Sequence, residues 1–252
     1  MLSVAKFFIA TVFLFSLNAN ARDVHILILQ ENSPSDCGAE VFDAAAGVYQ
    51  IGLDGEEISS RAPFVWGNCI DGNVVLPLGQ ALIMSGIGER VIFMPVGTRG
   101  TSLRDWLSGG IAHANMTLAL QKANDKNITF DYVLWNGAMV DTGSSVSRYQ
   151  SDVQKVLKDV KISTKADKFI ISKSIICNTG EVKRERDYRW DPLYKRFPGP
   201  DIDRLGKEYF SDGCNLNDLG KQRIAQLWLQ AIRKANIENE RYQKESLLYY
   251  LK

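Results

Sequence analysis

The sequence has little histidine, no charge excess and no apolar run long enough to span a membrane. Its 252 residues include only two histidines, His25 and His113, which excludes a His-rich metal site, and no metal or cofactor is expected. Lysine and arginine number 30 against 29 aspartates and glutamates. This balance gives no global attraction to nucleic acid or to an anionic membrane.

The longest apolar run lies at the N-terminus and is typical of a secretory signal. Lys6 precedes the apolar residues 7–17, and Ala19-Asn20-Ala21 has the small-x-small pattern of a cleavage site. An uncleaved anchor is the alternative, but the run is short for about 30 Å of hydrocarbon. We expect a secreted or periplasmic protein that begins at Arg22 and has no stable membrane insertion after cleavage.

The expected export bears on whether the four cysteines form disulfides. An oxidising compartment favours disulfides, and the absence of any C-x-x-C spacing argues against a structural zinc site. The cysteines Cys37, Cys69, Cys177 and Cys214 allow three complete pairings.

Strand-like and helix-like segments alternate along the remaining chain. The alternation predicts a three-layer α/β/α sandwich with a mainly parallel sheet. We expect one domain over residues 22–235 and a helical extension over residues 236–252, which docks as a helix or contacts a protein partner. Apolar runs predict buried strands at residues 24–29, 90–96, 132–135 and 168–172, and helical spacing predicts helices at 76–85, 111–124, 149–160 and 218–235.

In such sheets, sites form in loops beyond the carboxyl ends of the strands. The loops at residues 30–38, 97–106, 136–143 and 211–216 are therefore the candidates. Residues 181–198 carry many charges and aromatic rings. They are interpreted as a solvated loop over the site or as a sugar-contacting lid.

Motifs in these loops follow one another in a characteristic order. Residues 96–106 read Val-Gly-Thr-Arg-Gly-Thr-Ser-Leu-Arg-Asp-Trp, residues 133–135 read Val-Leu-Trp, and residues 212–215 read Asp-Gly-Cys-Asn. Together they resemble the second, third and last blocks of the SGNH hydrolases, in particular the sialate O-acetylesterase-like carbohydrate esterases. The resemblance implies an SGNH-hydrolase-like, flavodoxin-like fold and removal of acyl groups from sugars through a serine acyl-enzyme. Its partner would be a saccharide or acylated glycan, with no nucleic acid.

The resemblance also implies roles for single residues. In the first block, residues 30–33 read Gln-Glu-Asn-Ser where the family has Gly-Gln-Ser-Asn. An ungapped match therefore puts Asn32 at the nucleophile position, and a shift of one residue makes Ser33 the nucleophile. The other implied residues are Gly100 and Asn136 for the oxyanion, Arg99 and Trp106 for substrate, and the disulfide pairs Cys37–Cys69 and Cys177–Cys214.

The last block departs from the family pattern at its most important position. Asp212 is present, but Asn215 stands where the family has histidine. A carboxamide accepts no proton near neutral pH, so it cannot serve as the general base. The sequence therefore favours lost or strongly reduced esterase activity with a retained glycan or partner site. The alternatives are an active esterase that uses Ser33 with a non-standard base such as Asp212, and a structural role in envelope polysaccharide assembly.

Overall fold

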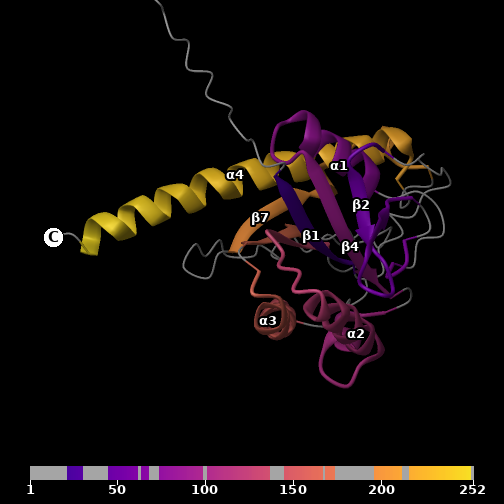
Figure 1. Cartoon of the computed structure of the whole chain (residues 1–252), viewed down its shortest axis with the longest axis vertical. Coiled ribbons are helices and arrows are strands. Elements are labelled where there is room, and N and C mark those ends of the chain that lie inside the picture. The colour runs from indigo at the N-terminus through magenta and orange to yellow at the C-terminus, as the bar shows by residue number, and fades with distance from the viewer. Residues whose placement is uncertain are drawn as a thin grey trace, which may run out of the picture.

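A seven-stranded sheet with the order β3-β2-β4-β1-β5-β6-β7 forms the centre of the molecule (Figure 1). The computed structural model describes residues 22–30, 45–61, 64–67, 74–98, 101–136, 145–166, 168–173, 196–211 and 216–250. All neighbouring strands pair in parallel except β2 and β3. The strands are β1 (Asp23–Gln30), β2 (Val48–Ile51), β3 (Glu57–Ser59), β4 (Arg90–Gly97), β5 (Tyr132–Asn136), β6 (Lys168–Lys173) and β7 (Arg196–Asp201).

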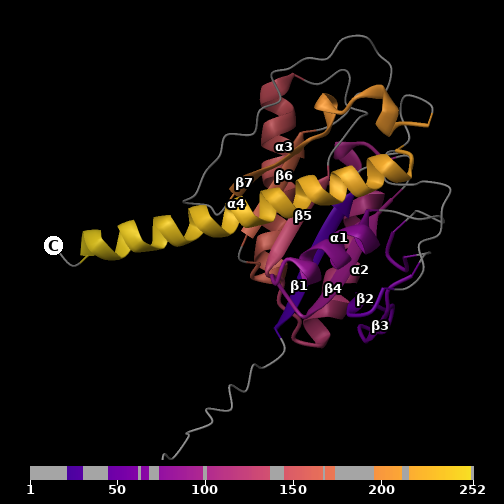
Figure 2. The ribbon, with the colours of Figure 1, turned by 90° about the horizontal axis from the view of Figure 1, so that it is seen from above.

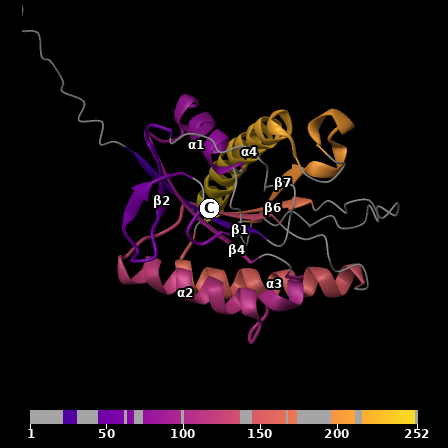
Figure 3. The same ribbon diagram turned by 90° about the vertical axis from the view of Figure 1, so that its right-hand side faces the viewer.

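Helices cover both faces of the sheet and complete three layers (Figure 3). Helices α1 (Val75–Met84) and α4 (Asp218–Tyr250) lie on one face, and α2 (Ile111–Asp125) and α3 (Val146–Thr164) on the other. Each face has its own apolar core. The predicted mainly parallel α/β/α sandwich is therefore confirmed. Three short 3-10 helices, η2 (Leu103–Trp106), η4 (Ile202–Arg204) and η5 (Lys207–Tyr209), lie in the connections.

Strand β1 is central because its side chains are apolar toward both faces. Ile26 packs into the core beneath α1 and α4, whereas Leu27 and Leu29 pack beneath α2 and α3. All three are fully buried. Burial on both faces is what a continuous aliphatic run indicates in a parallel sheet.

Helix α1 packs unusually close to the sheet at Gly79. A Cβ atom at this position would lie 2.7 Å from Cγ1 of Val48 and 3.1 Å from the ring of Phe93. The helix ends at Ser85, and Gly86 follows with a left-handed φ of +72°. Glycine adopts this conformation without the steric cost of a Cβ atom, which suits a helix C-terminus.

Several elements differ from the sequence-based expectation. Strands β2 and β3 were not predicted, and β7 begins at Arg196, inside the segment interpreted as a loop or lid. Helix α4 continues beyond Ala235 as one helix to Tyr250, and its C-terminal part extends past the sheet (Figure 2). No helix in the described part of the chain has the length and apolarity needed to cross a membrane.

Candidate functional site

The carboxyl ends of three neighbouring strands form one row at the edge of the sheet. Gln30 at the end of β1 is in register with Gly97 of β4 on one side and with Asn136 of β5 on the other. These residues begin three of the four loops that the sequence analysis selected. The parallel pairing therefore brings the starts of the first, second and third blocks together, as expected for a site at this edge.

Asn136 is the best-defined polar group in this row. Its side chain is buried, and Oδ1 accepts a hydrogen bond of 3.1 Å from Oγ of Ser172 in β6. Since this bond uses the carboxamide oxygen, it directs the Nδ2 donor away from Ser172. Asn136 thus has the fixed orientation that an oxyanion donor requires. Ser172 was missed by the sequence analysis, although it lies near the end of the strand next to β5.

The second block begins with a network of local hydrogen bonds. Oγ1 of Thr101 donates to the carbonyl of Thr98 at 2.5 Å. The carboxylate of Asp105 accepts from both the backbone N–H and the hydroxyl of Ser102, at 2.8 and 2.9 Å. This capping box starts η2 and stabilises the turn that follows β4.

Gly97 is held at the end of β4 by hydrogen bonds on both sides of its peptide unit. It ends β4 as a strand residue and is not among the described glycines with positive φ. Its backbone N–H donates to the carbonyl of Trp66 at 3.0 Å, and its own carbonyl accepts from Nδ2 of Asn115 at 3.3 Å. Asn115 in α2 therefore holds the end of β4, a role that the sequence did not reveal.

Trp106 lies in the core beneath the row of strand ends. It is 0% exposed, and its ring meets that of Trp135 edge to face, with centroids 5.5 Å apart. Among the described residues, neither indole N–H has a hydrogen-bond partner. The Trp106 side chain therefore packs in the core next to Trp135 and offers no exposed surface to a substrate.

Each histidine of the chain lies next to a carboxylate. His25 is near the start of β1, five residues before Gln30, which corresponds to about 16 Å at about 3.3 Å per residue. Its Nε2 lies 3.9 Å from the carboxylate of Glu57. His113 lies in the first turn of α2, and its Nε2 is 3.8 Å from the Asp159 carboxylate of α3. The His25 imidazole is therefore at the opposite end of β1 from the carboxyl edge.

The residues that flank the last block pair with each other. Phe210 and Leu216 form an antiparallel bridge, so the chain enters and leaves this block at neighbouring positions. Asn217 follows, and its Oδ1 accepts from the N–H of Gly220 at 2.9 Å while its Nδ2 donates to the carbonyl of Glu208 at 2.7 Å. The start of α4 is thereby capped.

The remaining predicted site residues lie outside the described part of the chain, as does the predicted signal at residues 1–21. Their roles stay predictions. No group of three or more metal-ligating side chains occurs among the residues that the structure describes. The predicted site residues that lie outside the described part are Asn32, Ser33, Arg99, Gly100, Asp212, Asn215 and the cysteines Cys37, Cys69, Cys177 and Cys214.

Comparison with known proteins gives similarity in structure alone. No family model and no curated protein sequence matches the chain. A protein from Arabidopsis thaliana superimposes with a TM-score of 0.63 at 12% identity, over 82% of this chain and 96% of its own. NanS superimposes with a TM-score of 0.54 at 8% identity, over 85% of this chain and 98% of its own. A GDSL-like lipase from Parabacteroides merdae gives 0.51 at 13% identity, over 84% of this chain and 97% of its own.

These likenesses cover nearly the whole of each solved chain, so the sheet and both helical layers are shared. The fold of this chain is the one that these solved structures share. At such low identity the likeness establishes the architecture, whereas function depends on the residues of the site.

Proposed function

We propose that this is an exported protein related to the carbohydrate O-acetylesterases, which binds acylated glycan and has lost most or all of its esterase activity. The residue at position 215 is the observation that carries this proposal. Position 215 holds asparagine, and the described contacts of the two histidines of the chain are with Glu57 and Asp159.

A serine hydroxyl needs a base to become an efficient nucleophile. General acid–base catalysis contributes about 10²–10⁴ in rate. A carboxylate such as that of Asp212 is a weak base when its pKa is near the ordinary value of about 4. We therefore expect ester turnover to be reduced by at least two orders of magnitude relative to a site with histidine.

The carboxamide of Asn136 supports the binding part of the proposal. It is held by Ser172, at the strand edge where Asn115 and Trp66 fix Gly97. A carboxamide oriented in this way suits recognition of an acyl carbonyl by a hydrogen bond, because the donor needs no reorganisation on binding. These features support glycan binding without requiring hydrolysis.

The test compares turnover with the Ser33→Ala variant. The purified protein is incubated with p-nitrophenyl acetate and with an acetylated oligosaccharide, and product is measured over time. We expect the wild-type rate to equal that of Ser33→Ala and of an enzyme-free blank within twofold. Robust turnover that depends on Ser33 would refute the proposal and favour the active esterase with a non-standard base.

A second experiment asks whether only the catalytic residues are missing. The double variant Asn32→Ser with Asn215→His restores the family residues at both positions. We expect it to gain measurable esterase activity, since the described strand ends are already aligned. An acetylated-glycan array then identifies the bound sugar, and binding of no sugar would contradict the glycan part of the proposal.

A further inference from the structure

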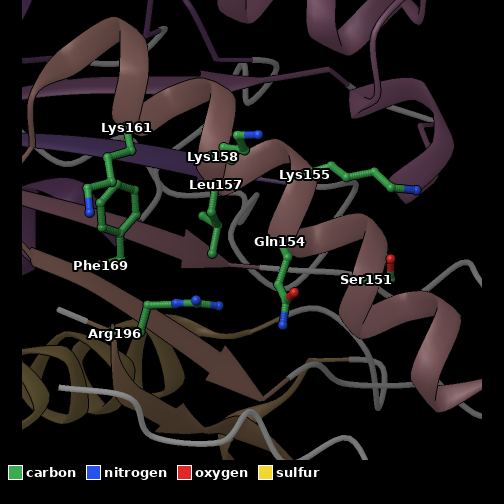
Figure 4. Close-up of a pocket in the computed structure, with 8 residues that line it drawn as sticks. All are labelled: Ser151, Gln154, Lys155, Leu157, Lys158, Lys161, Phe169 and Arg196. Carbon is green, nitrogen blue, oxygen red and sulfur yellow. The ribbon is translucent and has the colours of Figure 1, made fainter. Parts of the chain in front are cut away.

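A groove of about 510 Å³ lies between α3 and strands β6 and β7, on the sheet face opposite α4. The buried side chains of Leu157 and Phe169 lie at its base, and Arg196 enters from β7. Arg196 is the register partner of Phe169, so both belong to the same pair of strands. Figure 4 shows Arg196 extending along the groove toward Gln154 of α3. The volume lies within the range of small-molecule sites, about 300–1,000 Å³.

The helical side of the groove is a polar stripe set by the helix period. Ser151, Gln154, Lys158 and Lys161 follow one another at spacings of three, four and three residues. Residues with this spacing share one face of a helix. All four are exposed, and the buried valines of α3 occupy the opposite side.

Among the described residues, every charged side chain that lines the groove is positive. These side chains are Lys155, Lys158, Lys161 and Arg196. Lys155 is paired at 2.7 Å with Asp152, a neighbouring residue of α3. Neither Lys158 nor Lys161 forms an ion pair with any residue that the structure describes. In a chain with a net charge of only +1, this is a local concentration of cations.

The positive charge and the apolar surface of the groove together indicate which class of ligand fits it. Leu157 and Phe169 are only 5% and 2% exposed, so the apolar surface that the groove offers a ligand comes mainly from the aliphatic stems of its lysines. A nucleic acid strand would need an exposed aromatic face for base stacking, but Phe169 is only 2% exposed. A sugar acid combines a carboxylate with an apolar ring face that packs on aliphatic carbons, including the long stems of the lysines.

We propose that this groove binds a carboxylate-bearing segment of a saccharide chain. The saccharide part of this assignment rests on the proposed function, and the carboxylate part rests on Lys158, Lys161 and Arg196. Phe169 lies three residues before Ser172 in β6, about 10 Å at about 3.3 Å per residue. The Asn136 and Ser172 side chains follow Leu134 and Ile170 by two residues and share their face of the sheet, which α1 and α4 cover. The groove lies on the other face and is therefore a separate site from the Asn136 carboxamide.

The test measures binding of a galacturonate hexamer to the full chain by titration calorimetry at low ionic strength. We expect Lys158→Gln combined with Lys161→Gln to weaken binding at least tenfold. The matched control, Lys207→Gln with Lys244→Gln, removes the same charge from exposed positions outside the groove and should change binding by less than twofold. Added salt should weaken binding to the wild type, because exposed charges are screened.

Four results would overturn the assignment. The first is that the hexamer does not bind at millimolar concentration, and the second is that the groove and control variants weaken binding equally. The third is that a carboxyl-reduced, neutral hexamer binds equally tightly. The fourth is that a single-stranded oligonucleotide binds more tightly than the hexamer and that the groove variant abolishes this binding. Thermal unfolding of each variant verifies that these exposed substitutions leave the fold intact.

Failure of the groove assignment is distinguishable from failure of the proposed function. Ser33→Ala should leave hexamer binding unchanged, and the groove variant should leave reaction with p-nitrophenyl acetate unchanged. Ser33-dependent turnover would refute the proposed loss of activity without affecting the binding result. Conversely, a failure of the hexamer to bind would refute the groove assignment without affecting the turnover result.

Discussion

The hydrogen bond between Ser172 and Asn136 gives the sharpest test of the edge geometry. Both side chains are buried, at 7% and 4% exposure, and the bond length is 3.1 Å. Ser172→Ala removes the donor and leaves Oδ1 of Asn136 without it in a region that water does not reach. A net hydrogen bond is worth about 0.5–1.5 kcal/mol, and an orphaned buried acceptor costs about 1–3 kcal/mol. We therefore expect Ser172→Ala to lower the free energy of unfolding by about 1–2 kcal/mol.

Urea unfolding of a double-mutant cycle isolates this interaction from the other contacts of Asn136. Ser172→Ala, Asn136→Ala and the double variant should give a coupling free energy of about 1 kcal/mol. Ser85→Ala is the matched control, because Oγ of Ser85 donates to the carbonyl of Leu82, which also accepts from a backbone N–H. That control should cost less than about 0.5 kcal/mol. A coupling indistinguishable from zero would show that Ser172 does not orient Asn136.

Three further substitutions test other parts of the structure. Gly79→Ala should lower the free energy of unfolding by about 1 kcal/mol in urea. Crowding of Val48 costs about 1–3 kcal/mol, and the gain in helix propensity offsets about 1 kcal/mol of this cost. Increased stability would contradict the close packing of α1. Asp105→Ala should lower stability by about 1 kcal/mol through loss of the capping box with Ser102, read as a lower Tm, and an unchanged Tm would argue against that cap. His113→Ala should leave both glycan binding and any ester turnover unchanged, whereas a tenfold loss of turnover would place this histidine in the site.

Much of the fold was predictable because its signals are local. The aliphatic run of β1, the helical spacing of α2 and the strand of β5 all appear where the sequence placed them, within one or two residues. Strands β2 and β3 are four and three residues long, too short to produce a clear period. Strand β7 contains two prolines and a glycine, which disfavour a strand prediction, and it is tolerated as the edge strand of the sheet.

The site was predictable in outline and less so in detail. The loops that follow β1, β4 and β5 start at one edge of the sheet, as predicted, since parallel topology brings the carboxyl ends of these strands together. The partner of Asn136 was not found, because Ser172 comes from a different strand and no sequence spacing links the two. Trp106 belongs to a motif, but its burial against Trp135 is a tertiary contact.

The sequence by itself determined the class of fold and the absence of a histidine at position 215, because both depend on residue type and order along the chain. Only the tertiary structure decided that His25 lies beside Glu57 and that His113 lies beside Asp159. It also decided that Arg196 joins Lys158 and Lys161 in one groove. The physical reason is that strand pairing and helix packing join residues far apart in the chain, and no local pattern records those contacts.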